Sequence, residues 1–100
     1  LGEHQKAFEL NEEAYELRCK VLGEKHPDTL TSLVNLASIC GKLGDHQKAL
    51  EINEKAYELR RKVLGEEHPD TLTALNNLAY EYSELGEHKK ALELKRKHMN

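Results

Sequence analysis

The sequence predicts an all-α protein, a solenoid of antiparallel helix pairs built from a repeated unit. Residues 43–84 repeat residues 1–42 with 29 identical positions out of 42, and residues 85–94 begin a third copy. A fixed period of about 20–50 residues is typical of architectures in which each unit stacks on the next. Within each copy, apolar residues recur at spacings of three and four, which indicates helices that each bury one face.

The first two helices are predicted over residues 3–22 and 28–42. The apolar stripe of the first consists of Ala7, Leu10, Ala14, Leu17 and Val21, with Phe8, Tyr15 and Leu22 beside it. Gly23 follows this stripe, where helices commonly end in a left-handed residue. Pro27 suits the start of the second helix because its missing N–H needs no partner there. Asp28 places a carboxylate at the positive end of that helix.

The remaining helices are predicted over residues 45–64, 69–84 and 87–98. Asp45 can act as the N-cap of the third helix. The fifth helix repeats the start of the first, but its apolar pattern fails near residue 98. Because the loops are short, successive helices should be antiparallel neighbours. A small rotation from unit to unit would then build a right-handed superhelix with one concave wall.

Composition and charge exclude several classes of protein. The net charge of −3 and the isoelectric point near 6.1 do not favour a nucleic-acid-binding protein, which would need a clustered basic face. No apolar run approaches the ~18–20 residues that span a bilayer. We expect one repeat array over residues 1–100, with copies at 1–42 and 43–84 and a partial copy at 85–100. Because the chain starts without Met and within a repeat, we expect it to be a fragment of a longer array.

The two cysteines, Cys19 and Cys40, lie 21 residues apart in the chain. Their spacing fits neither a CxxC metal site nor a disulfide framework. Their repeat equivalents are Arg61 and Tyr82, so thiols are not part of the repeated design. We expect reduced, structural cysteines in a cytoplasmic protein, with Cys40 taking a buried aromatic position as a small apolar residue.

The second copy carries a recognisable pattern of small residues. In the segment LGDHQKALEINEKAYEL, a glycine and two alanines occur at Gly44, Ala49 and Ala56. This spacing resembles that of the tetratricopeptide repeat, with His46 in place of the family's usual tyrosine. The repeat length of 42 residues exceeds the ordinary ~34. In this respect the chain is similar to the repeats of kinesin light chains.

The resemblance implies a concave groove that binds a peptide or helix of a partner protein. On this chain the groove wall would consist of Thr31, Val34, Asn35, Ser38, Lys42, Thr73, Asn76, Asn77, Tyr80 and Glu84. Asn35 and Asn77 match the family's recurring groove asparagine, whose amide both donates and accepts hydrogen bonds. The alternative is that these asparagines bond neighbouring helices or face water. The carboxylate clamp of some relatives needs paired basic residues, which this wall lacks.

The six histidines raise the question of a metal site. His4, His46 and His88 recur with the repeat, so they should lie about 10 Å apart, the packing distance of helices. A single metal ion needs its ligands at about 2 Å. We therefore interpret the histidines as packing or linker residues and expect no metal and no cofactor. No Ser-His-Asp or Cys-His arrangement is evident, so we expect no enzyme.

Three functions remain open from the sequence. The first is a protein–protein interaction scaffold that binds a peptide or helix in the concave groove. The second is a self-assembling structural module. Its uncapped terminal helices would stack end to end or exchange between copies, and the chain would form homo-oligomers. The third is a sensor segment of a larger regulatory protein.

Overall fold

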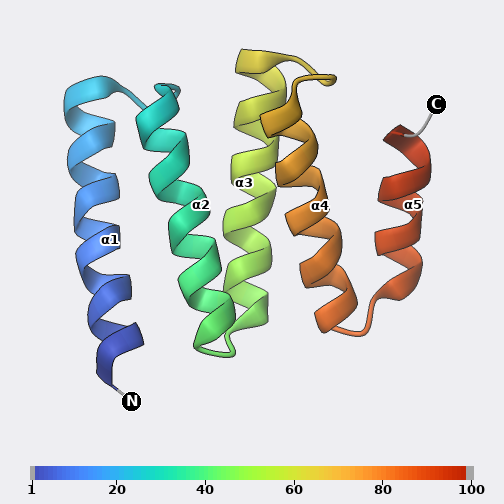
Figure 1. Ribbon diagram of the computed structural model, residues 1–100, viewed down its shortest axis with the longest axis horizontal. Helices are drawn as coiled ribbons and strands as arrows, with labels where there is room; N and C mark the ends of the chain where they lie inside the picture. Colours follow the sequence, from blue (N-terminus) through green and yellow to red (C-terminus); the bar gives the residue numbers. More distant parts are fainter. Residues whose placement is uncertain (1, 99–100) are drawn as a thin grey trace.

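The structure is a computed structural model that describes residues 2–98. In this part of the chain it contains five α-helices and no strand. The helices are α1 (Gly2–Leu22), α2 (Pro27–Lys42), α3 (His46–Leu64), α4 (Pro69–Glu84) and α5 (His88–His98). They stand side by side in chain order, each antiparallel to the next (Figure 1). The all-α solenoid is confirmed, and no helix boundary differs from its predicted position by more than one residue.

Two histidines cap the helices that begin with proline. His26 precedes α2, and its Nδ1 accepts the backbone N–H of Asp28 at 3.1 Å. His68 precedes α4 and accepts the N–H of Asp70 at 3.0 Å. A cap of this kind satisfies one of the free N–H groups of the first turn. These two histidines are linker residues, as expected, and they also set where α2 and α4 begin.

The other helix ends follow the predicted turn chemistry. Asp45 caps α3, where its Oδ1 accepts the N–H of Lys48 at 3.1 Å. Gly23 follows α1 with a φ of +94°, which L side chains rarely adopt. Gly65 occupies the same position after α3 with φ 96° and ψ 160°. For the equivalent glycine after the first helix, we expected a left-handed helical conformation. The ψ of Gly65 lies outside that conformation, in a region populated almost entirely by glycine.

The helices form a thin slab whose principal extents are 38 × 32 × 15 Å. Its apolar core lies in two clusters. The first consists of Phe8, Leu36, Cys40 and Ala49. The second consists of Leu50, Tyr57, Ala74, Leu75 and Leu78. Alanines with no exposed surface on α3 and α4 let the helix backbones approach closely.

The apolar stripe predicted for α1 is not the buried face of this helix. Leu10, Leu17 and Val21 are 67%, 56% and 78% exposed. The buried residue is Phe8, at 8% exposed, which the sequence places beside the stripe. The reason is that α1 packs mainly on α2, whereas α3 packs on both α2 and α4. In α1 the stripe lies on the side that no other helix covers.

Both cysteines are free thiols, as expected. Cys40 is 1% exposed and packs with Phe8, Leu36 and Ala49, so its predicted role as a small apolar core residue is confirmed. Burial raises the pKa of the Cys40 thiol, because the charged thiolate is disfavoured away from water. Cys19 is half-buried in α1.

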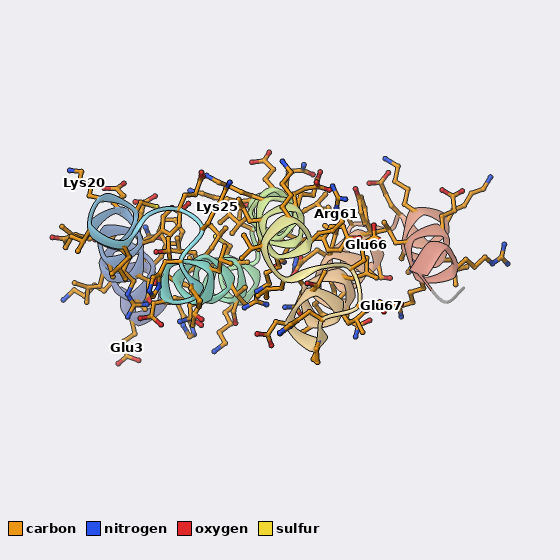
Figure 2. The ribbon with its side chains drawn as sticks, turned by 90° about the horizontal axis from the view of Figure 1, so that it is seen from above. Glu3, Lys20, Lys25, Arg61, Glu66 and Glu67 are labelled. Atoms are coloured by element: carbon orange, nitrogen blue, oxygen red, sulfur yellow. The ribbon has the colours of Figure 1, made fainter. Side chains whose placement is uncertain are left out.

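The outer surfaces of the helices carry many charged side chains. Figure 2 shows Glu3, Lys20 and Arg61 among those at the periphery of the slab. This charge accords with a structure in which each helix buries only one side. Among the described helices, none combines the length and the apolar character that crossing a membrane requires.

Candidate functional site

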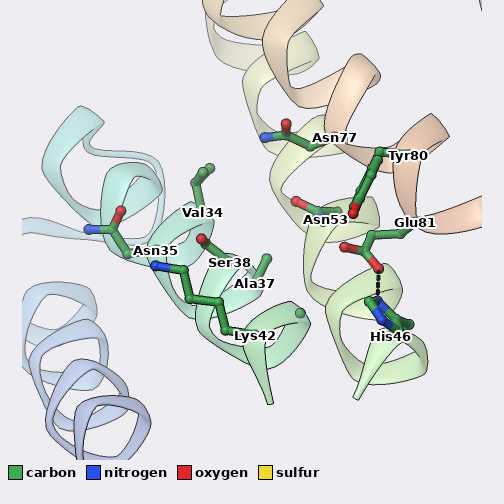
Figure 3. Close-up of a pocket in the computed structure, with 11 residues that line it drawn as sticks. Val34, Asn35, Ala37, Ser38, Lys42, His46, Asn53, Asn77, Tyr80 and Glu81 are labelled. Carbon is green, nitrogen blue, oxygen red and sulfur yellow. Dashed lines mark hydrogen bonds and ion pairs between the residues drawn. The ribbon is translucent and has the colours of Figure 1, made fainter. Parts of the chain in front are cut away.

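A cleft of about 480 Å³ opens between α2 and α4, with α3 forming its floor (Figure 3). The residues from α2 are Val34, Asn35, Ala37, Ser38, Gly41 and Lys42. From α4 come Asn77, Tyr80 and Glu81, and from α3 come His46 and Asn53. The structure thus brings together six of the ten groove residues proposed from the sequence: Val34, Asn35, Ser38, Lys42, Asn77 and Tyr80.

Four of the proposed groove residues do not line this cleft: Thr31, Thr73, Asn76 and Glu84. The two threonines are exposed, and each donates its hydroxyl hydrogen bond at 3.0 Å to the proline carbonyl that opens its own helix. Asn76 is exposed on α4. Glu84 forms a hydrogen bond with the exposed hydroxyl of Tyr80, which raises the pKa of Tyr80.

The two walls of the cleft differ in charge. Lys42 extends along the α2 wall toward Asn35, whereas Glu81 points from the α4 wall toward α3 (Figure 3). Asn77 is half-buried on the α4 wall, and its amide points toward the α2 side of the cleft. Tyr80 is 58% exposed, so most of its ring is available to a ligand. The cleft therefore offers amide groups, one aromatic ring and charges of both signs.

Sequence reasoning missed the contact between Glu81 and His46 in this cleft. Glu81 is 5% exposed, and its Oε2 lies 2.9 Å from Nδ1 of His46. The pair joins α4 to α3 at the floor of the cleft. One signal was present in the sequence, because the repeat equivalent of Glu81 is Ile39. A charged residue at a position that is apolar in the other copy indicates a role that is specific to this position and is not part of the repeated packing.

The remaining histidines do not share this arrangement. His4 and His88, the repeat equivalents of His46, are both exposed, so their predicted role as packing residues is wrong. At the position equivalent to Glu81, the first copy has the apolar Ile39, so His4 has no matching carboxylate there. In the described part of the chain, no group of three or more His, Cys, Asp or Glu residues could hold a metal ion.

The differences between the two copies concentrate around the cleft. The 42 aligned positions contain 29 identities, which leaves 13 differences. Five of them form one unbroken run, residues 38–42 against residues 80–84. This run supplies five cleft residues: Ser38, Gly41, Lys42, Tyr80 and Glu81. The cleft combines shared and specific positions. Asn35 and Asn77 are equivalent and identical in the two copies, whereas six other cleft residues differ from their repeat equivalents: Val34, Ser38, Gly41, Lys42, Tyr80 and Glu81.

Two further clefts lie elsewhere on the slab and follow the repeat. One of about 280 Å³ is lined by residues of α1, α2 and α3, including Phe8, Tyr15 and Ile52. Another of about 410 Å³ lies one repeat later between α3, α4 and α5. In the first, the Lys48 ammonium lies 4.5 Å from the ring centroid of Phe8 and covers it. These clefts are products of the repeated packing, so the cleft between α2 and α4 is the better candidate site.

A comparison with protein-family models matches the tetratricopeptide repeat over residues 1–62 and 33–100. The chain belongs to the tetratricopeptide repeat family. Repeats of this family generally mediate protein–protein interaction and are typically non-enzymatic scaffolds. The search of curated proteins finds no match.

Solved structures of similar tetratricopeptide arrays support this assignment. One is the crystal structure of the nearly identical TPR-like repeats of a kinesin light chain-like protein from Podosopora anserina, with a TM-score of 0.86 and 33% sequence identity. The match covers 97% of this chain and 46% of that chain. A substituted form of the same protein matches with a TM-score of 0.83 and 33% identity, over 98% of this chain and 46% of that one. The array thus spans about half the length of the structures it matches, and its resemblance to kinesin light chain-like repeats is confirmed.

Proposed function

We propose that this tetratricopeptide repeat array is an interaction scaffold that binds a segment of a partner protein in the cleft between α2 and α4. The observation that supports the proposal most strongly is the concentration of differences between the copies at 38–42 and 80–84. Many residues at the helix interfaces are identical in the two copies, for example Leu33 and Leu75, or Leu36 and Leu78. Six of the eleven cleft residues differ from their repeat equivalents, which fits a surface that recognises a particular ligand.

The chemistry of the cleft suits a polypeptide segment. The amides of Asn35 and Asn77 can each donate to a backbone carbonyl and accept from a backbone N–H. Tyr80 presents an exposed ring beside them, and aromatic residues are common anchors of protein interfaces. A peptide that lies between the two walls would use both features at once.

The proposal is tested by replacing one of two adjacent asparagines on α4. Peptides selected from a displayed random library on the unaltered protein serve as the probe. Asn77→Ala should weaken their binding by about 5- to 30-fold, which corresponds to about 1–2 kcal/mol for a lost and partly buried hydrogen bond. The measurement is the dissociation constant by isothermal titration calorimetry.

Asn76→Ala is the matched control, because Asn76 is exposed next to Asn77 but does not line the cleft. It should leave the dissociation constant unchanged. Circular dichroism must show equal helicity for both variants. If the two substitutions affect binding equally, or if neither does, the cleft is not the binding site.

A second candidate function is self-association through the outer face of α1. Leu10, Leu17 and Val21 form an exposed apolar stripe along one side of this helix. In α3, two of the three equivalent positions, Ile52 and Leu59, are half-buried, and Ile52 packs against the cluster of Phe8, Leu36, Cys40 and Ala49. The third, Val63, is 40% exposed. A second copy of the chain could cover the α1 stripe in a similar manner.

Self-association predicts a mass that rises with concentration. Light scattering coupled to size exclusion over about a hundredfold range should show a dimer or larger species at high concentration, and the substitutions Leu10→Lys and Val21→Lys should abolish it. Glu9→Lys, at an exposed residue on another side of the same helix, should not. A monomer of 11.5 kDa at every concentration would rule this function out.

We also propose that the chain works in a reducing compartment such as the cytoplasm. The support is that both of its cysteines are free and that one of them is a core residue. Disulfides are rare in such compartments, where buried thiols act as small apolar groups.

A further inference from the structure

We propose that the cleft between α2 and α4 selects a partner segment with a basic side chain, lysine or arginine, and that Glu81 is its anchor. This inference rests on the proposed function and names the chemistry of the partner. It begins from a single feature, a carboxylate that is 5% exposed at the floor of the cleft.

A buried carboxylate is costly, because it loses most of its hydration on folding. In Glu81 only part of this loss is offset within the structure, through the contact of Oε2 with Nδ1 of His46 at 2.9 Å. The His46 side chain is 28% exposed and the Glu81 side chain 7%, so the carboxylate keeps only a small accessible surface. A second partner of Glu81, one that carries a positive charge, would offset the rest of the lost hydration.

The repeat does not require this carboxylate. At the equivalent position the first copy has Ile39, which packs against the apolar cluster of Phe8, Leu36 and Cys40. An apolar residue can therefore pack at this position of the helix, and it avoids the free-energy cost of burying a charge. The replacement of an isoleucine by a glutamate at a cleft position indicates a function in binding.

The second carboxylate oxygen of Glu81, Oε1, lies beside Gly41 of the opposite wall. A Cβ added at Gly41 would meet Oε1 of Glu81 at 3.4 Å, so the glycine leaves the space above this oxygen unfilled. The repeat equivalent of Gly41 is Ser83, so the missing side chain is also specific to this cleft. A lysine ammonium or an arginine guanidinium entering beside Gly41 could donate to Oε1.

The other charges of the cleft leave this position free for a cation. Lys42 extends along the opposite wall toward Asn35 and away from Glu81 (Figure 3). Tyr80 stands next to Glu81 on α4, and its ring could receive the stem or the charge of a basic side chain. The α4 wall is therefore the side of the cleft that would hold the basic residue.

The test starts from peptides selected on the unaltered protein with a random library. The selected peptides should share one lysine or arginine. Replacing that lysine with norleucine, or that arginine with citrulline, keeps the shape and removes the charge. We expect this change to weaken binding to the unaltered protein by at least about tenfold, within the range for hydrogen-bonded charge pairs that lose a partner.

Glu81→Gln should remove this discrimination, so that the charged and the neutral peptide bind the variant with similar dissociation constants. Glu54→Gln is the matched control, because it removes the same charge from an exposed residue of α3 that does not line the cleft. It should preserve the discrimination. The peptide replacements are made on the unaltered protein, so they remain decisive if Glu81→Gln fails to fold.

The results separate this inference from the proposed function. If selected peptides lack a shared basic residue, or if Glu81→Gln keeps the preference for charge, Glu81 only joins α3 to α4 and the inference is overturned. The proposed function would stand in that case, provided that Asn77→Ala still weakens binding. If Asn77→Ala and Glu81→Gln both leave binding unchanged, the proposed function fails together with the inference.

Discussion

Replacing Leu30 with alanine is expected to lower the free energy of unfolding by about 2–5 kcal/mol, the range for large-to-small changes in a packed core. The same replacement at Leu72, its repeat equivalent, is expected to cost about 1 kcal/mol or less. Both leucines follow the same four residues, His-Pro-Asp-Thr, and each lies in the first turn or two of its helix. Their local sequences therefore do not distinguish them.

The difference lies in what covers each leucine. Leu30 is 2% exposed, because α2 lies between α1 and α3. Leu72 is 41% exposed, although α4 also lies between two helices. Its second neighbour, α5, has 11 residues, whereas α3 has 19, so less helix is available to cover the start of α4. A side chain that is already partly in water loses less on truncation.

The measurement is urea unfolding of the two variants, followed by circular dichroism at 222 nm. Equal slopes with denaturant are needed, since only then do the midpoints report stability alone. Equal losses of stability at the two positions would show that the start of α4 is buried in solution, for example by a second copy of the chain.

Replacing Ala56 with leucine is expected to destabilise the protein by about 1–3 kcal/mol, because three extra carbons must enter a filled space. Ala56 has no exposed surface, and its helix, α3, packs on both α2 and α4. At Ala14, the equivalent position of α1, the same replacement is expected to change stability by no more than about 0.5 kcal/mol. Ala14 is half-buried, because α1 packs mainly on α2.

Thermal unfolding by calorimetry gives the comparison directly. For a domain of this size, a loss of 1 kcal/mol lowers the midpoint by about 4–8 °C. Ala56→Leu should therefore show a clear shift, and Ala14→Leu should stay close to the unaltered protein. An unchanged midpoint for Ala56→Leu would mean that the packing around α3 is looser than the structure indicates.

Much of the fold follows from local sequence. Pro27 opens α2 as predicted, Asp45 caps α3, and Gly23 has the positive φ expected after a helix. These features depend on backbone sterics and on hydrogen bonds between residues close in the chain. The 42-residue period also predicts the order in which the helices stack, because repeated units of similar sequence pack each on the next.

The candidate site was predictable in part. Helical periodicity and the family resemblance place Asn35 and Asn77 on one side of α2 and α4, and the structure brings both to the cleft. The floor was not predictable in the same way. His46 and Asn53 belong to α3, and they reach the cleft because α3 passes beneath the gap between its two neighbours.

By itself, the sequence determined the five helices, their order and their repeat, because these depend on short-range interactions and on a periodicity that can be counted. Only the tertiary structure decided which side of each helix is covered. It exposes Leu10 on α1 and brings Glu81 to within 2.9 Å of His46, 35 residues earlier in the chain. Burial and contacts between distant side chains depend on which helices are neighbours in space and on how long each neighbour is. Two nearly identical copies can therefore differ in both.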